Sequence, residues 1–153
     1  MNMIKPNTPV LAVLTLSIFV SLQSLAQQPN VDKKGLAIQG FDPVSYFAPN
    51  GPMKGIKEIQ SSIKGRIYYF ASAKNKVAFD ANPTRYEPKC GGWCAYAIGL
   101  DASQVKVNPK PFKIIDNRLY LFYDFFGIDT LEKWNENETD FKAKAEENWI
   151  NLK

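Results

Sequence analysis

The stretch "KGRIYYFASAKNKVAFDANPTRYEP" (residues 64–88) decides how this chain folds. Its first part, Ile67–Phe70, is β-branched and aromatic, as strands favour. Immediately before it, Glu58–Lys64 places Ile59 and Ile63 among polar positions. Gly65-Arg66 separates the two segments and is suited to a tight turn, so the sequence predicts a β-hairpin here.

A helix is expected directly after this hairpin. Ser72 is a good N-cap residue, because its side-chain oxygen can accept a hydrogen bond from the first turn. Residues 73–81 carry Ala, Val and Ala four positions apart, which is helical spacing. Asn82-Pro83 ends the helix, because the residue before a proline is pushed out of the helical region.

Further from this unit, the patterns add a second hairpin and more helices. Residues 112–115 and 118–123 flank Asp116-Asn117, a two-residue turn signal. Val44–Phe47 is expected to be a short strand, Gly92–Ile98 a short helix, and the tail from Leu131 onward helical. No internal repeat is apparent. The chain is therefore predicted to be a small α+β single domain with two β-hairpins and three to four helices.

The first 26 residues have the character of a removed signal peptide. Lys5 supplies positive charge, and residues 10–20 are uncharged and mostly apolar, too short a run to cross a bilayer as a helix. Ser24 and Ala26 have the spacing that a signal peptidase accepts. We expect residues 1–26 to be a signal peptide, 27–35 a flexible N-terminus, and 36–150 the domain. The mature protein would then be periplasmic or secreted, with no stable membrane insertion.

Composition excludes several classes of function. The chain has no histidine, so a Ser-His-Asp or Cys-His catalytic group cannot be built, nor can a His-ligated haem or a Cys/His zinc site. The net charge is only +4, with both signs mixed along the chain and no block of Lys and Arg to follow phosphates. Nucleic acid is therefore not expected as a partner.

The order of the predicted elements resembles the YHS-domain family, in particular its exported single-domain bacterial members. The resemblance covers residues 36–150 and is carried by these segments: "AIQGFDPVSYF", "KGRIYYFASAKNKVAFDANPTRYEP", "GGWCAYAIG", "PKPFKIIDNRLYLFYD" and the helix ending in "AEENWI". The family implies a small α+β module related to treble-clef, metal-binding modules. It also implies cysteine ligands for transition metals, copper included.

This chain departs from the family at the implied ligand positions. Ser45 follows Asp-Pro-Val where metal-handling members carry Cys, and Ala71 and Asn75 stand in the other two cysteine places. Alanine has no donor atom, and serine and asparagine are poor ligands for soft metals. The resemblance therefore carries the fold further than the chemistry.

The only two cysteines, Cys90 and Cys94 in "YEPKCGGWCAY" (86–96), lie outside those positions and leave four alternatives. Export favours a disulfide, although the closed loop would be very short. The apolar surroundings are equally typical of two buried thiols that act as small core residues. Two thiolates could also bind Cu(I), or Zn(II) with help from carboxylates or water. Finally, Cys94 could be a reactive thiol if it begins a helix near Lys89.

Taken together, the sequence predicts an exported YHS-like binding module rather than an enzyme. Transition-metal handling, with copper foremost, is what the family implies, and Cys90 and Cys94 would be the ligands. The alternatives are a thiol or redox enzyme that uses Cys94, and a structural domain that binds a protein partner through aromatic residues in 119–126.

Overall fold

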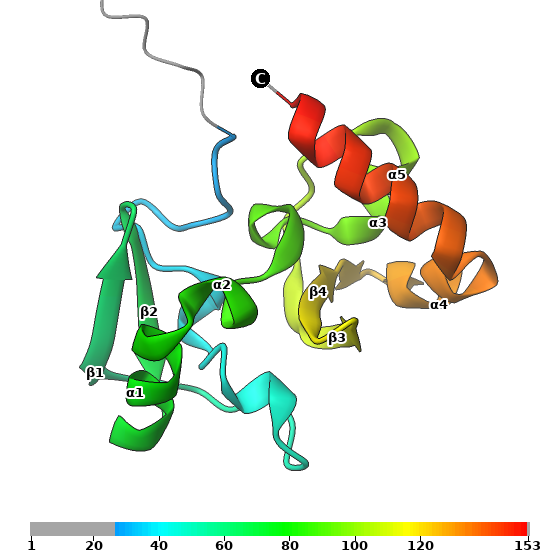
Figure 1. Cartoon of the computed structure of the whole chain (residues 1–153). Coiled ribbons are helices and arrows are strands. Elements are labelled where there is room, and N and C mark those ends of the chain that lie inside the picture. The colour runs from blue at the N-terminus through cyan, green and yellow to red at the C-terminus, as the bar shows by residue number, and fades with distance from the viewer. Residues whose placement is uncertain (1–26, 153) are drawn as a thin grey trace, which may run out of the picture.

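The computed structural model describes residues 27–152, whose elements form two groups that lie side by side (Figure 1). The first group contains the hairpin of β1 (Ile56–Ile63) and β2 (Arg66–Phe70), followed by helices α1 (Ala73–Ala81) and α2 (Pro83–Tyr86). The second contains α3 (Ala95–Asp101), the hairpin of β3 (Asn108–Ile115) and β4 (Arg118–Phe122), α4 (Thr130–Glu136) and α5 (Glu138–Asn151). Both predicted hairpins and the α+β class are confirmed.

The first hairpin and the helix that follows it form as predicted. β1 and β2 are antiparallel and joined by Lys64 and Gly65, both with positive φ, as a two-residue hairpin turn requires. The Ser72 hydroxyl accepts a hydrogen bond from the Asn75 amide at 3.1 Å and caps α1. Helix α1 ends at Ala81, one residue before Asn82.

One element prediction was wrong, and a second element lies a few residues later than predicted. Val44–Phe47 is not a strand: Ser45–Phe47 is a 3₁₀ turn (η2). The predicted helix at Gly92–Ile98 begins later, at Ala95, because the preceding residues turn through a second 3₁₀ segment, η3 (Lys89–Gly92). Three consecutive positive φ angles, from Cys90 to Gly92, keep the chain out of the helix there.

The structure also has more elements than expected. The part of the chain that it describes holds five α-helices and three two-stranded sheets. The third sheet pairs β5 (Asp124–Phe125) with β6 (Ile128–Asp129) around a turn at Phe126-Gly127. Strands of two residues are too short for an alternation pattern to reveal.

The two hairpins are copies of one another. In the first, Ile56 pairs with Phe70, the register then shifts, and Gln60 pairs with Tyr69. In the second, Asn108 pairs with Phe122, the register shifts, and Phe112 pairs with Leu121. Every pair of the second hairpin lies 52 residues beyond its counterpart. Four of the eight residues around the two turns are also identical: Ile63/Ile115, Arg66/Arg118, Tyr68/Tyr120 and Phe70/Phe122.

The repeat extends upstream of the hairpins at the same offset. Gln39 and Gly40 in the first half, within η1 (Ile38–Gly40), and Gly91 and Gly92 in the second all have positive φ. The Asp42 amide donates to the Met53 carbonyl, and the Cys94 amide donates to the Val105 carbonyl, both at 2.9 Å. The expectation of no internal repeat was therefore wrong: residues 38–70 and 90–122 share one backbone plan.

Strand β4 lies between the two halves of the core. Its residues alternate sides, as in any strand. Leu119 and Leu121 face the cluster that contains Tyr68, Phe70 and Phe79. Tyr120 and Phe122 face a second cluster, whose other buried members are Cys90, Ala95, Ile98, Trp134 and Ala145. Trp134 is fully buried there and packs against Tyr120 and Phe122.

Residues 27–35, expected to be a flexible N-terminus, are bonded to the second half. The Trp93 indole N–H donates to the Gln28 carbonyl at 2.8 Å, and the Asn30 amide donates to the Gly91 carbonyl at 2.9 Å. Val31 also forms a β-bridge with Ala37. These bonds place the segment across η3, and the chain before residue 27, including the predicted signal peptide, lies outside the described residues.

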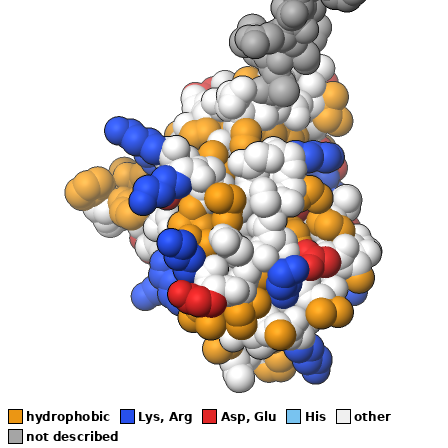
Figure 2. Space-filling model, turned by 90° about the vertical axis from the view of Figure 1, so that its left-hand side faces the viewer, with side chains coloured by type: hydrophobic (Ala, Val, Ile, Leu, Met, Phe, Trp, Pro, Cys, Tyr) orange, Lys and Arg blue, Asp and Glu red, His pale blue; other side chains and the backbone are white. Residues whose placement is uncertain are grey.

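The face made by β1, β2 and α1 mixes hydrophobic with basic side chains (Figure 2). The large apolar side chains exposed on these elements are those of Ile56 and Val77. Within residues 27–152, no helix is both long enough and apolar enough to span a bilayer.

Candidate functional site: a cavity lined by two equivalent arginines

A cavity of about 520 Å³ lies where the two halves of the repeat meet, and we call it the arginine cavity. Lys64 and Arg66 line it from the β1–β2 hairpin, and Arg118 lines it from the β3–β4 hairpin. Arg66 and Arg118 are equivalent positions of the repeat, each the first residue after its hairpin turn. The remaining lining residues come from the N-terminal segment, residues 87–91 and α5: Gln27, Gln28, Pro29, Glu87, Pro88, Lys89, Cys90, Gly91 and Trp149.

The charge in this cavity is positive and only partly balanced. Arg66 forms an ion pair with Glu87, the one carboxylate of the lining, at 3.2 Å. Neither Lys64 nor Arg118 forms an ion pair with any residue between 27 and 152. The cavity is therefore a favourable place for a negatively charged group.

Each arginine also has a buried Nε–H without a hydrogen-bond partner among the described residues. The Nε atoms of Arg66 and Arg118 are shielded from solvent and donate to no acceptor among the described residues. A buried donor without an acceptor costs about 1–3 kcal/mol, so proteins rarely leave one unused. Here two of them belong to equivalent residues that line the same cavity.

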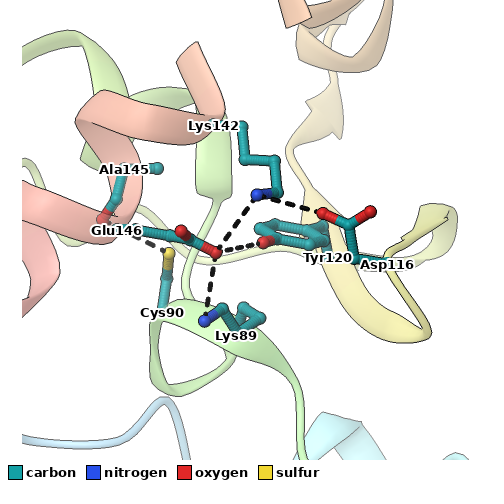
Figure 3. Close-up of polar contacts among 7 residues, drawn as sticks. All are labelled: Lys89, Cys90, Asp116, Tyr120, Lys142, Ala145 and Glu146. Carbon is teal, nitrogen blue, oxygen red and sulfur yellow. Dashed lines mark hydrogen bonds and ion pairs between the residues drawn. The ribbon is translucent and has the colours of Figure 1, made fainter. Parts of the chain in front are cut away.

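Behind the cavity, Glu146 collects a network of polar contacts (Figure 3). Its carboxylate accepts a hydrogen bond from the Tyr120 hydroxyl at 2.7 Å and pairs with Lys89 at 3.1 Å. Lys142 lies 3.7 Å from the same oxygen and 3.1 Å from Asp116. The network holds Lys89 at the cavity wall, with its charge already balanced by Glu146.

The same network explains how these groups titrate. Burial alone would raise the pKa of Glu146, but the hydrogen bonds from Tyr120 and Lys89 outweigh it and leave this pKa below its usual value. Burial raises the pKa of Tyr120, and its hydrogen bond to Glu146 adds to the rise. Tyr68, at the equivalent position of the repeat, likewise donates to a carboxylate, that of Glu87 at 3.3 Å.

Cys90 lies beside this network as a buried, protonated thiol. Its sulfur lies 3.9 Å from the Ala145 carbonyl (Figure 3). Burial raises the pKa of the Cys90 thiol to about 12; the charge of Lys89 opposes this rise, and the charges of Glu146 and Cys94 add to it. At neutral pH such a thiol is neither a good nucleophile nor a ready metal ligand.

Cys94 is fully buried on the other side of β4, in the first core cluster. Its sulfur contacts the Thr130 hydroxyl at 3.3 Å. The two cysteines are thus free thiols with different partners, and the structure contains no disulfide between them. A substrate could not reach Cys94 without an opening of the core, so the geometry does not favour the thiol-enzyme alternative.

The metal prediction for Cys90 and Cys94 stays a prediction. Both would have to leave their present contacts, with Ala145 and Thr130, to hold one ion between them. In residues 27–152, no group of three or more Cys, Asp or Glu side chains is placed to hold a metal.

The three positions where the YHS resemblance implies cysteines lie together, around the carboxylate of Asp42. Asp42 is fully buried and accepts hydrogen bonds from the Ala71 amide at 2.8 Å and the Asn75 side-chain amide at 2.6 Å. The Val44 amide donates to its other oxygen at 2.8 Å, and the Ser45 hydroxyl donates to its backbone carbonyl at 2.6 Å. Backbone and amide donors occupy the carboxylate, so this place has a structural role.

The aromatic stretch at 119–126 divides between core and surface. Residues 119–122 are buried in β4 and offer no surface to a partner. Only Phe125 and Phe126, in the β5–β6 hairpin, are exposed, Phe126 almost completely.

Sequence reasoning missed Lys64, Arg66 and Arg118 as site residues. The signal was the repeated pattern Ile-x-x-Arg-x-Tyr-x-Phe at 63–70 and 115–122. It places one arginine directly after each hairpin turn, but the pattern alone does not reveal that both arginines line one cavity.

Comparisons with family models, with curated proteins and with solved structures found no match to this chain.

Proposed function

We propose that this protein is an exported binding module that holds a negatively charged small molecule in the arginine cavity. The observation that carries the proposal is that Lys64, Arg66 and Arg118 line one cavity whose lining holds a single carboxylate, that of Glu87, which pairs with Arg66. Lys64 and Arg118 form no ion pair within residues 27–152. An oxyanion would balance this positive charge, and a guanidinium group has a geometry that suits carboxylate or phosphate.

The cavity also meets the general requirements of a ligand site. Its volume of about 520 Å³ falls within the range of roughly 300–1,000 Å³ that small-molecule sites occupy. Its walls come from parts of the chain that are distant in sequence but fixed by hydrogen bonds, so most of the site is preformed. Export is proposed on the pattern of residues 1–26, and binding rather than catalysis on the absence of histidine and the burial of both thiols.

The proposal is tested by titrating the purified protein with inorganic phosphate in low-salt buffer and measuring heat by calorimetry. Arg118→Gln and Arg66→Gln should each weaken binding about tenfold or more, because a hydrogen bond to a charged group contributes about 1.5–3 kcal/mol. Arg85→Gln is the matched control. Arg85 is exposed on α2 and packs its guanidinium against Phe47 and Tyr86, outside the cavity lining.

Binding should also weaken as salt is raised, because ions screen the attraction between charges. If the parent binds phosphate and both cavity variants bind it equally well, the arginine cavity is not the site and the proposal is wrong.

A further inference from the structure

We infer that the ligand of the arginine cavity is an organic anion with a flat apolar body, its charged group at Arg66 and Arg118 and its body against Trp149. The inference rests on the anion-binding function proposed above, and it adds the chemical class of the ligand. The cavity lining combines cationic side chains with apolar ones.

Part of the cavity lining is cationic and part of it is apolar. Lys64, Arg66 and Arg118 supply charge from the two hairpin turns. The apolar lining comes from Pro29, Pro88, Gly91 and Trp149. A ligand with charge alone would leave the apolar lining in contact with water, whereas an amphipathic ligand would cover it.

The apolar wall is built around Gly91. A Cβ atom on this residue would lie 2.6 Å from Trp149 Cη2 and 3.5 Å from Pro29 Cα, so the edge of the indole lies directly against the Gly91 backbone. Hydrogen bonds from Asn30 to the Gly91 and Gly92 carbonyls, both 2.9 Å, hold the N-terminal segment in place beside it. Trp149 therefore lines the cavity with one edge of its ring packed against the Gly91 backbone.

The size of the cavity favours a ligand larger than an inorganic ion. Its volume is about 520 Å³, whereas one water molecule takes up about 30 Å³ of liquid. Phosphate or sulfate would occupy only a small part of that space. An aromatic or cyclic body attached to the anionic group would fill the remainder and gain the stacking contact that indole rings favour.

The test compares two probes, phenyl phosphate and inorganic phosphate, by calorimetry on the parent and on Trp149→Leu. We expect the parent to bind phenyl phosphate about tenfold more tightly than inorganic phosphate, and Trp149→Leu to reduce that ratio to about threefold or less. Ile150→Ala is the control, because Ile150 is the exposed next residue of α5 and does not line the cavity. Its ratio should equal that of the parent.

A second measurement does not depend on how well Trp149→Leu folds. In the parent, phenyl phosphate should shift the NMR signal of the Trp149 indole N–H, and saturating inorganic phosphate should shift it much less. Equal affinity for the two probes, or a ratio unchanged by Trp149→Leu, overturns the inference. The proposed function survives that result if Arg66→Gln and Arg118→Gln still weaken phosphate binding. If neither probe binds the parent, both proposals are wrong.

Discussion

Replacing Asp42 should destabilise the protein more than replacing any exposed carboxylate, although Asp42 forms no ion pair with residues 27–152. The carboxylate is fully buried and accepts three short hydrogen bonds, from the amides of Val44, Ala71 and the Asn75 side chain, at 2.6–2.8 Å. Asp42→Ala leaves these three donors buried without an acceptor. Each costs about 1–3 kcal/mol, and partial relaxation and entry of water reduce the sum, so we expect a loss of about 3–5 kcal/mol. Asp42→Asn keeps one acceptor oxygen and should cost about 2–3 kcal/mol.

The assay is urea unfolding followed by circular dichroism, with Asp80→Asn as the matched control. Asp80 is exposed on α1, where it pairs with Lys76 and accepts from the Ser61 hydroxyl at 2.5 Å. Exposed pairs of this kind contribute about 0–1 kcal/mol. If Asp42→Asn and Asp80→Asn cost the same free energy, the buried carboxylate does not organise the fold and the reasoning fails.

Three further outcomes follow from the structure. Gly91→Ala places a methyl group 2.6 Å from the Trp149 ring, at a residue with a φ of +60°. It should therefore lower the melting temperature by several degrees and change the tryptophan fluorescence. An unchanged melting temperature would contradict the close approach of Gly91 and Trp149. If Cys90 and Cys94 bind Cu(I), the parent should take up one equivalent of Cu(I) slowly, because both thiols are buried. The double variant Cys90→Ser/Cys94→Ser should take up none. Equal Cu(I) loading of the two proteins would show that the cysteines are not the ligands. The pKa of the Cys90 thiol rises from 9.0 to about 12 on folding, so the unfolded chain loses this proton first and stability should fall as pH rises from about 9 toward 12. Cys90→Ala should make that fall shallower in urea titrations at pH 8, 9 and 10, and an identical slope would show that this thiol does not contribute.

Local signals were enough to predict the first hairpin and helix. The turn residues, the cap at Ser72 and the break at Asn82-Pro83 each depend only on neighbours in sequence. The backbone around Cys90 was not predictable in this way. Its positive φ is unusual for a residue with a side chain, and the contacts that stabilise it come from residues 29–30 and α5.

The candidate site was less predictable than the fold. The sequence points to the two cysteines as candidate ligands because thiols bind metals, yet both are buried. The cavity beside Cys90 is lined by arginines, and nothing in their sequence context distinguishes them from other charged residues. Arg66 and Arg118 stand 52 residues apart, and only the pairing of the two hairpins shows that they are equivalent. Convergence of this kind depends on tertiary packing, which the local patterns do not encode.

Because the two arginines belong to one continuous chain, their surroundings are able to differ. In a symmetric dimer of two identical half-length subunits, every substitution would appear on both sides of the cavity between them. In this protein Lys64 lines the cavity, whereas its counterpart Asp116 turns away to pair with Lys142. Because the two halves are parts of one chain, the cavity can be asymmetric and can therefore distinguish the two ends of an asymmetric ligand.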